Sequence, residues 1–457
     1  MTEKLKQTLR DSKKARWTTL VVVAILMFAG YFFTDVMSPL KPMLEAEMGW
    51  TSSDYGFFTS AYGWFNVFLL LLIVGGIILD KMGVRFTGVM AAAIMVVGAS
   101  IKYWAISTIF DADDKIFDIS AQVVYAALGF AIFAVGVEIA GITVSKVIVK
   151  WFKGYEMAMA MGFEMAIARL GTALALASPV PLYTLFDNSI SAPLAFGLVL
   201  LVIGLISFLA FNVMDKKLDK SVVDSGAEKE EEDNFKISDL GLILKNKGFW
   251  LIAFLCVLFY SSVFPFLKYA ADLMVNKYGV DPGTAGLIPS LLPFGTLFLT
   301  PFFGNLYDRK GKGATIMIIG SAMLIGVHTL FSIPFLDHWL IAVALVLVLG
   351  VAFSLVPAAM WPSVPKIIPE KQLGSAFSLI FWIQNWGLMG VPYLIGVVLD
   401  KYCITGSVTL DGLTRNTYDY TLPMMIFTGF GILAIFVALA LKAEDKKKGY
   451  GLELPNM

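Results

Sequence analysis

The sequence predicts an all-α integral membrane protein whose 12 transmembrane helices form two pseudo-symmetric six-helix bundles. Three observations predict this fold class: the composition, the spacing of the apolar runs and an internal repeat. Of the 457 residues, 58% are apolar and 15% are charged, and the mean hydropathy is +0.77. Soluble domains contain about 25% charged residues, so we expect most of this chain to be surrounded by lipid.

The apolar runs are long enough to cross a bilayer, and charges, glycine or proline bound them. Backbone polar groups cannot stay unpaired in hydrocarbon, and a spanning helix needs about 20 residues, so each run is predicted to be a helix. The predicted helices are 17–38, 54–79, 85–108, 120–148, 157–184, 190–213, 247–275, 284–306, 313–334, 339–364, 373–399 and 420–442.

A long polar interval separates the first six predicted helices from the last six. We therefore predict an N-terminal half at 1–213, a linker at 214–246 and a C-terminal half at 247–457. The linker contains the acidic run 228–233, which we interpret as a solvated surface. The first apolar run is longer than a signal-peptide core and lacks a small-residue cleavage site, so we expect the first helix to be retained.

Basic residues are distributed unequally between the two sides that these helices define. Of the 35 Lys and Arg residues, 27 fall on the side that carries both tails and the linker, and two fall inside helices. The six on the opposite side are Lys41, Lys102, Lys115, Lys277, Lys401 and Arg415. The positive-inside rule therefore predicts that both termini are cytoplasmic.

Several function classes lack support in the sequence. The net charge is zero and there is no basic tract, which argues against nucleic acid as a partner. Cys256 and Cys403 lack the spacing of a metal site or a disulfide framework, and no hydrolase or phosphate-loop motif is present. We expect no enzyme activity, no metal and no cofactor, but a monomeric carrier of a small-molecule substrate that is driven by gradients.

Two loops of the chain match each other. The sequence GIILDKMGVRF starts at Gly76, and GNLYDRKGKGA starts at Gly304, so the offset of 228 residues is half the chain. The shared pattern comprises Gly76, Asp80, Lys81, Gly83 and Arg85 in the first copy and Gly304, Asp308, Arg309, Gly311 and Gly313 in the second. Such a duplication is typical of secondary transporters, and we predict that both loops act as cytoplasmic gating motifs.

Ionisable residues within the predicted helices are candidates for function because their insertion into a membrane is costly. Glu138 and Arg169 are predicted at the same depth on adjacent helices, where they either bind a zwitterionic substrate or form a permanent salt bridge. Asp35 is predicted to be hydrated at a helix end or to lie at the cavity mouth. Lys268 is predicted to line the cavity beside Pro265 or to extend toward the membrane surface.

Two further predictions concern the walls of the cavity. Glu164 is five residues from Arg169, about 140° around the helix, so we expect it to face the gating loop. Aromatic and amide side chains on three helices are candidates for the cavity walls. They are Tyr62, Trp64, Asn66, Trp361, Gln384 and Asn385.

The repeated loop resembles the loop signature of the major facilitator superfamily, and the resemblance covers essentially the whole chain. Other stretches resemble the lysosomal dipeptide-transporter branch of that superfamily. They are 62–68, 134–171, 262–266 and 358–388. The resemblance implies that Glu138 contacts the substrate amine and that Arg169 contacts its carboxylate, a group that suits an arginine fork.

The chain also departs from that branch. Its N-terminal tail, MTEKLKQTLRDSKKAR, lacks a di-leucine sorting signal, so we expect a bacterial-type relative in the inner membrane. The leading hypothesis is alternating-access transport of dipeptides or similar small zwitterions, by uniport or coupled to protons. The alternative is a proton-coupled symporter of small organic anions that uses Arg169 and Lys268, and a transport-inactive receptor is a third, weaker hypothesis.

Overall fold

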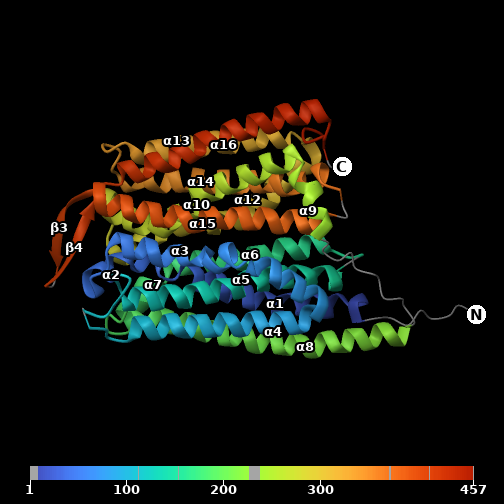
Figure 1. Cartoon of the computed structure of the whole chain (residues 1–457), viewed down its shortest axis with the longest axis horizontal. Helices are drawn as coiled ribbons and strands as arrows, with labels where there is room; N and C mark the ends of the chain where they lie inside the picture. Colours follow the sequence, from blue (N-terminus) through green and yellow to red (C-terminus); the bar gives the residue numbers. More distant parts are fainter. Residues whose placement is uncertain are drawn as a thin grey trace, which may run out of the picture.

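The computed structural model describes residues 9–111, 113–152, 154–225, 237–369, 372–410 and 412–455. The predicted acidic run at 228–233 lies outside these residues. Helices dominate the described chain, and Figure 1 shows them in two groups that lie side by side. We call α1 to α8 the N-terminal bundle and α10 to α16 the C-terminal bundle.

The N-terminal bundle contains long helices and several short elements. They are η1 (Leu9–Asp11), α1 (Lys13–Asp35), η2 (Ser38–Leu40), α2 (Lys41–Met48), α3 (Ser52–Phe68), α4 (Leu71–Ser107), β1 (Lys115–Ile116), β2 (Ile119–Ser120), α5 (Ala121–Phe152), α6 (Met157–Ala177), α7 (Pro179–Leu185) and α8 (Ser191–Ser225). Strands β1 and β2 form a short antiparallel pair between α4 and α5.

The C-terminal bundle follows the short helix α9 (Ile237–Leu244). Its elements are α10 (Lys247–Tyr278), α11 (Pro282–Ala285), α12 (Leu287–Lys310), α13 (Gly313–Ser332), α14 (Trp339–Ile367), α15 (Leu373–Tyr402), β3 (Ile404–Leu410), β4 (Leu413–Tyr418) and α16 (Thr421–Lys448). Strands β3 and β4 pair as an antiparallel hairpin that the sequence analysis did not predict.

Among the described residues, 11 helices are long and apolar enough to cross a membrane. The remaining predicted span, 54–79, is divided between α3 and the first turns of α4. The division lies at Leu70, which has a φ of 55°, and the indole of Trp382 donates to the Val67 carbonyl at 3.0 Å beside it. The loop predicted after position 79 is a tight turn at Gly83, whose φ of 77° and ψ of 171° are not helical, and this residue separates two helical segments of α4.

Two other predicted boundaries were wrong. The span predicted at 157–184 is divided into α6 and α7, and Pro179 stands at the first position of α7, where its missing N–H is tolerated. The span predicted at 190–213 continues as α8 to Ser225, so the first part of the predicted linker is helical.

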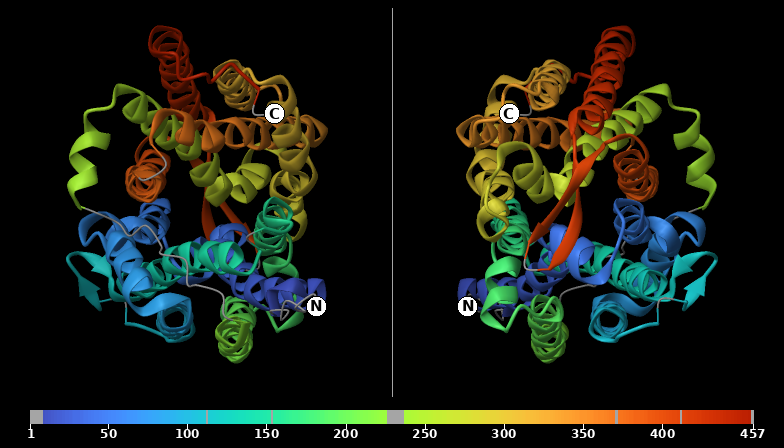
Figure 2. Two further views of the ribbon diagram at one scale, coloured as in Figure 1. Left: turned by 90° about the vertical axis from the view of Figure 1, so that its right-hand side faces the viewer. Right: turned by 90° about the vertical axis from the view of Figure 1, so that its left-hand side faces the viewer.

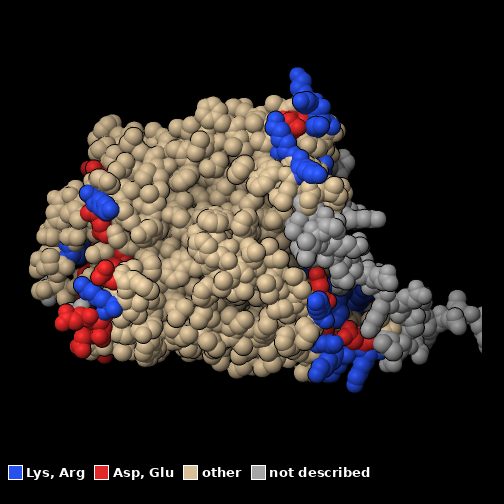
Figure 3. Space-filling view, viewed as in Figure 1, with Lys and Arg blue, Asp and Glu red and all other residues tan. Residues whose placement is uncertain are grey.

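The two ends of the elongated molecule differ in their elements. Both termini and α9 lie at one end, which we call the terminal end, and β3, β4 and α2 lie at the other, which we call the hairpin end (Figure 1). Figure 2 shows the two bundles from each end. On the face drawn in Figure 3, charged side chains gather at the two ends and leave an uncharged band between them, as expected of a protein that crosses a bilayer.

The bundles contact each other mainly through α3 with α15 and α6 with α12. Glycine permits these contacts near the hairpin end. A Cβ atom on Gly286 would lie 1.9 Å from the Leu176 carbonyl oxygen, and one on Gly396 would lie 2.3 Å from the Ser52 carbonyl oxygen. Small residues therefore allow the backbones of opposite bundles to touch.

Candidate functional site

A cavity of about 760 Å³ lies between the two bundles. Residues of α1, α3, α4, α5 and α6 line one side, and residues of α10, α14 and α15 line the other. The lining includes Asp80 and Gly374, which are exposed toward the terminal end, so the cavity reaches the surface there. Small-molecule sites typically occupy about 300–1,000 Å³, which includes this volume.

Most of the candidate residues named in the sequence analysis line this cavity. They are Asp35, Tyr62, Glu138, Arg169, Lys268, Trp361 and Asn385. Gln384 lines it as well, whereas Trp64 and Asn66 do not contribute to its lining. The role of the lining residues in substrate binding remains a prediction, but these residues come from both bundles and surround the same space.

Glu138 and Arg169 both line the cavity but make different contacts. The hydroxyl of Tyr62 donates to Glu138 Oε1 at 2.9 Å. The Arg169 guanidinium carbon lies 5.6 Å from the ring centre of Tyr31 and 5.0 Å from that of Phe353. Among the described residues, Arg169 makes no ion pair or hydrogen bond, so the permanent salt bridge with Glu138 is not formed in this structure.

Asp35 and Lys268 bind each other, which neither of their predicted roles anticipated. Lys268 Nζ lies 2.5 Å from Asp35 Oδ1 and donates to the Thr34 carbonyl at 2.8 Å. The two side chains come from different bundles and are largely buried. Asp35 is therefore not simply hydrated, and Lys268 does not extend to the membrane surface.

The cavity also contains residues that were assigned elsewhere or were missed. Glu164 is only 7% exposed and lines the cavity together with Gly76 and Asp80 of the first repeated loop, which it was predicted to face. The sequence analysis missed Tyr31 and Tyr260, although a hydroxyl inside a long apolar run was the available signal. Tyr260 accepts a hydrogen bond from the Trp361 indole at 3.1 Å.

Asn385 offers an unpaired acceptor beside the cavity. Its Nδ2 donates to the Phe381 carbonyl at 2.9 Å, whereas its Oδ1 is buried without a partner among the described residues. A buried acceptor without a donor carries a desolvation cost, so this oxygen is suited to receive a donor from a ligand.

In the first predicted gating loop, the charged side chains bind partners in the N-terminal bundle. Asp80 accepts from Lys146 at 3.0 Å, and Arg85 donates to Asp219 at 2.7 Å. Lys81 is exposed, and Gly76 lines the cavity.

The second gating loop is fastened by the chain end instead. The backbone N–H groups of Lys312 and Gly313 donate to the carbonyls of Glu453 and Leu452 at 3.0 and 2.8 Å. Gly304, Asp308 and Arg309 lie in the last two turns of α12. The repeat is visible in the backbone, because Gly83 and Gly311 adopt positive φ angles of 77° and 67° at matching positions.

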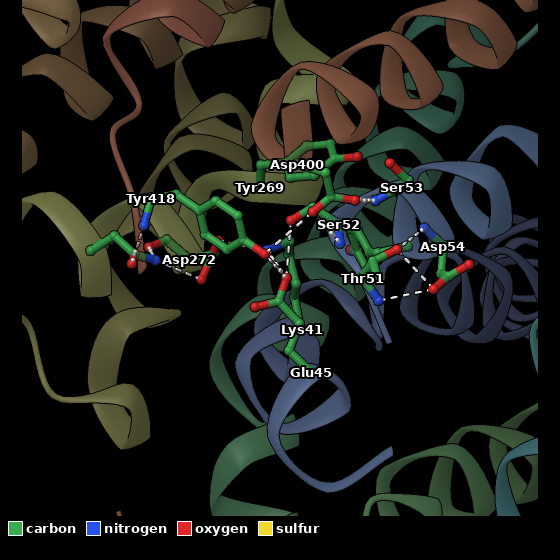
Figure 4. Close-up of polar contacts among 12 residues, drawn as sticks. Lys41, Glu45, Thr51, Ser52, Ser53, Asp54, Tyr269, Asp272, Asp400 and Tyr418 are labelled. Atoms are coloured by element: carbon green, nitrogen blue, oxygen red, sulfur yellow. Dashed lines mark hydrogen bonds and ion pairs between the residues drawn. The ribbon is translucent and has the colours of Figure 1, made fainter. Parts of the chain in front are cut away.

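A buried polar network joins the two bundles at the hairpin end (Figure 4). Lys41 Nζ lies 2.6 Å from Glu45 Oε1 and 2.8 Å from Asp272 Oδ2, and Lys41 is fully buried. Lys102 is also fully buried, with its Nζ 4.5 Å from the ring centre of Phe130. The sequence analysis counted both lysines on the side opposite the termini but did not predict that they would be buried.

The sequence is similar to those of known membrane transporters. The Major Facilitator Superfamily matches residues 23–392 and 273–452. The lysosomal dipeptide transporter MFSD1 of Bos taurus is 26% identical over 395 residues, covering 84% of this chain and 80% of the relative. The probable sulfoacetate transporter SauU of Cupriavidus necator is 24% identical over 461 residues, covering 95% of this chain and 97% of the relative.

The fold has counterparts among solved structures. The crystal structure of the nucleoside transporter NupG superposes with a TM-score of 0.67 at 15% identity, covering 93% of this chain and 98% of that one. The two helical bundles around a central cavity, the duplicated loop and the sequence match agree with one another. The chain is an integral membrane transporter, not an enzyme, and it belongs to the Major Facilitator Superfamily.

Proposed function

We propose that this protein transports dipeptides or similar small zwitterions by alternating access. The observation that carries the proposal is the presence of one carboxylate and one guanidinium, from Glu138 and Arg169, in the same cavity without an ion pair between them. A zwitterion needs an anion for its amine and a cation for its carboxylate. Charges that already neutralised each other could not supply either without first separating.

In the proposed binding mode, Glu138 accepts from the substrate amine and Arg169 donates to the substrate carboxylate. The hydroxyl of Tyr62 holds one oxygen of Glu138, which orients the carboxylate and leaves its other oxygen for the ligand. The aromatic rings around Arg169 restrict its guanidinium without using its N–H donors. The name of the relative MFSD1, a lysosomal dipeptide transporter, supports this substrate class.

The proposed function requires a membrane orientation and two halves that move relative to each other. We place both termini in the cytoplasm of a bacterial cell and the protein in the inner membrane, because the basic residues concentrate at the terminal end. The cavity then opens to the cytoplasm in this structure. Residues 1–213 and 247–457 are the proposed moving halves, and the two gating loops control their approach at the terminal end. Uniport and proton-coupled transport remain open alternatives within the proposal.

Transport of small organic anions is the second candidate. Arg169 lacks a carboxylate partner among the described residues, and the relative SauU bears the name of a probable sulfoacetate transporter. However, the second cation that this candidate requires, Lys268, is already paired with Asp35. Dipeptides are therefore the preferred substrates.

Counterflow uptake into proteoliposomes tests the proposal. We expect exchange of labelled Ala-Ala by the parent protein, and loss of that exchange in Glu138→Gln and in Arg169→Ala. Glu47→Gln serves as the matched control because Glu47 is exposed and is not among the residues that line the cavity. The melting temperature of each variant reports whether the fold is intact.

The same protein preparations separate the two candidates. Ligand binding raises the melting temperature by mass action, so dipeptides should stabilise the parent protein and the control variant. Stabilisation by simple carboxylates alone would overturn the dipeptide proposal and favour the anion candidate. Normal uptake by Glu138→Gln or by Arg169→Ala would show that the substrate binds elsewhere.

A further inference from the structure

The polar network at the hairpin end joins the two bundles through buried charges (Figure 4). Its single cation, Lys41, contacts Glu45 of its own bundle and Asp272 of the other. A third carboxylate, Asp400, accepts from the backbone N–H groups of Ser52 and Ser53 at 3.0 and 2.5 Å. The network therefore contains three carboxylates and one ammonium group.

Two of the three carboxylates are fully supported as anions. Asp272 Oδ2 accepts hydrogen bonds from Lys41 and from the hydroxyl of Tyr420, and its Oδ1 accepts one from the amide of Asn276. Asp400 lies against the N-terminus of α3, where unpaired N–H groups and the helix dipole stabilise a negative charge. Each of these carboxylates therefore has a donor on both of its oxygens.

Glu45 is the exception. Its Oε1 accepts hydrogen bonds from Lys41 Nζ at 2.6 Å, Ser52 Oγ at 3.0 Å and Tyr418 Oη at 3.1 Å. Its Oε2 is buried without a hydrogen-bond partner among the described residues, and the side chain as a whole is 6% exposed. A buried anionic oxygen without a donor is far costlier than a buried neutral hydroxyl.

The charges of the network balance when Glu45 carries a proton. Lys41 and Asp272 then form a neutral pair, and the N-terminus of α3 supports Asp400. The titratable and charged groups that surround Glu45 are shared among α2, α10, α15, β4 and the start of α16. They are Lys41, Tyr269, Asp272, Asp400, Tyr418 and Tyr420.

We propose that Glu45 is a proton-binding site, occupied while the hairpin end is closed and emptied when it opens. Opening separates Asp272, Asp400 and Tyr418 from Glu45, because these residues belong to the other bundle. Water then reaches Glu45 and solvates its anion, so the proton leaves to the water at the hairpin end. Closure takes one proton back from the same water. The inference does not depend on the identity of the substrate.

Closing the hairpin end is therefore coupled to binding one proton. Acidification should favour the closed form, and the ratio of closed to open molecules should rise by up to about tenfold per pH unit over the range in which the proton is exchanged. In the proposed orientation, acid outside the cell favours the form that opens to the cytoplasm.

A distance measurement across the hairpin end tests this coupling directly. Leu185 and Phe335 are 74% and 79% exposed and belong to different bundles, whereas the native Cys256 and Cys403 are buried. Spin labels are therefore attached at Leu185→Cys and Phe335→Cys. The distances between them, measured by pulsed electron paramagnetic resonance, report the closed and open populations. Spectra of the full-length protein in lipid nanodiscs are compared at a series of values from about pH 5.5 to about pH 8, which lie above the reference pKa of about 4.3 for a free glutamate side chain.

We expect the closed fraction of the parent protein to fall as the pH rises. Glu45→Gln imitates the protonated form, so its closed fraction should be high and independent of pH. Glu47→Gln is the matched control on the same helix, and its pH response should equal that of the parent. A parent protein without a pH response, or a Glu45→Gln variant that keeps it, would overturn the proposal.

A second variant keeps the proposal testable if Glu45→Gln fails to fold. Tyr418→Phe removes a hydrogen bond to Glu45 Oε1 that only the closed form makes, and it leaves Glu45 in place. The pH at which half of the molecules are closed should then shift downward relative to the parent, while the pH response itself remains. An unchanged or higher midpoint, or a loss of the pH response, contradicts the role of Glu45. Neither result bears on dipeptide exchange, which the counterflow assay measures separately.

Discussion

The two ends of the molecule use their ion pairs differently. Among the described residues, the ion pairs that join the two bundles are Lys41 with Asp272 and Lys268 with Asp35, and both lie on the hairpin side. At the terminal end, several ion pairs between described residues join partners of the same bundle. They include Arg16 with Glu156, Arg85 with Asp219 and Lys247 with Glu444.

This difference shows which contacts determine the conformation. A pair within one bundle moves as a unit and persists when the bundles separate, whereas a pair between bundles must break. Removing one partner of a buried pair costs about 3–5 kcal/mol, and exposed pairs contribute only about 0–1 kcal/mol. The closed hairpin end is therefore held by specific side chains from both bundles.

The largest effect should come from Lys41→Met. The substitution leaves Glu45 and Asp272 buried without their cation, and we expect the closed form to lose about 3–5 kcal/mol relative to the open form. The labelled pair at Leu185 and Phe335 should then report mostly long distances. This outcome would establish the network as the closing contact.

The control for this variant is Lys115→Met, which removes an exposed lysine at the same end. Its distance distribution should match that of the parent. If Lys41→Met lowers only the melting temperature and the hairpin end stays closed, the network supports the fold and does not set the conformation.

The next effect concerns backbone contact rather than charge. In Gly286→Ala the new Cβ would lie 1.9 Å from the Leu176 carbonyl oxygen of the opposite bundle, so the two must move apart. Overpacking costs about 1–3 kcal/mol, which should favour the open hairpin end. Gly295→Ala in α12 is the matched control because its Cβ would meet only Leu299, at 3.9 Å. Equal distance distributions for the two variants would contradict this account.

Much of the fold follows from local sequence. Long apolar runs predicted the helices, and the repeated loop predicted the duplication, which appears as positive φ angles at Gly83 and Gly311. The break at Leu70 has no glycine or proline to mark it, and it is stabilised by Trp382, more than 300 residues away. The hairpin of β3 and β4 had a local signal, since the sequence Asp-Gly at 411–412 is a turn dipeptide between alternating residues.

The candidate site was only partly predictable for the same reason. Depth along the helices identified Glu138 and Arg169 as cavity candidates, because depth follows from counting residues. Partners across bundles do not follow from counting. Lys41 and Asp272 are 231 residues apart, and Lys268 and Asp35 are 233 apart, so only the packed bundles reveal that each lysine is neutralised.

A smaller effect is expected from Lys268→Met. It leaves Asp35 without its cation, but the pair borders the cavity and Lys268 retains some exposure, so water compensates in part. We expect a loss of about 1–2 kcal/mol for the closed hairpin end, below the range for fully buried pairs. The double variant Lys268→Met with Asp35→Asn should recover most of it, as a double-mutant cycle would report. Additive losses would show that the two residues act independently.

The smallest effect should come from Arg85→Ala at the terminal end. Arg85 and Asp219 belong to one bundle and are 37% and 39% exposed, so solvent screens their pairing. We expect a loss of stability below about 1 kcal/mol and no change in the distance between Leu185 and Phe335. Dipeptide counterflow should continue in this variant. A change in the hairpin-end distance would mean that this pair influences the approach of the bundles from the opposite end, and the contrast between the two ends would then fail.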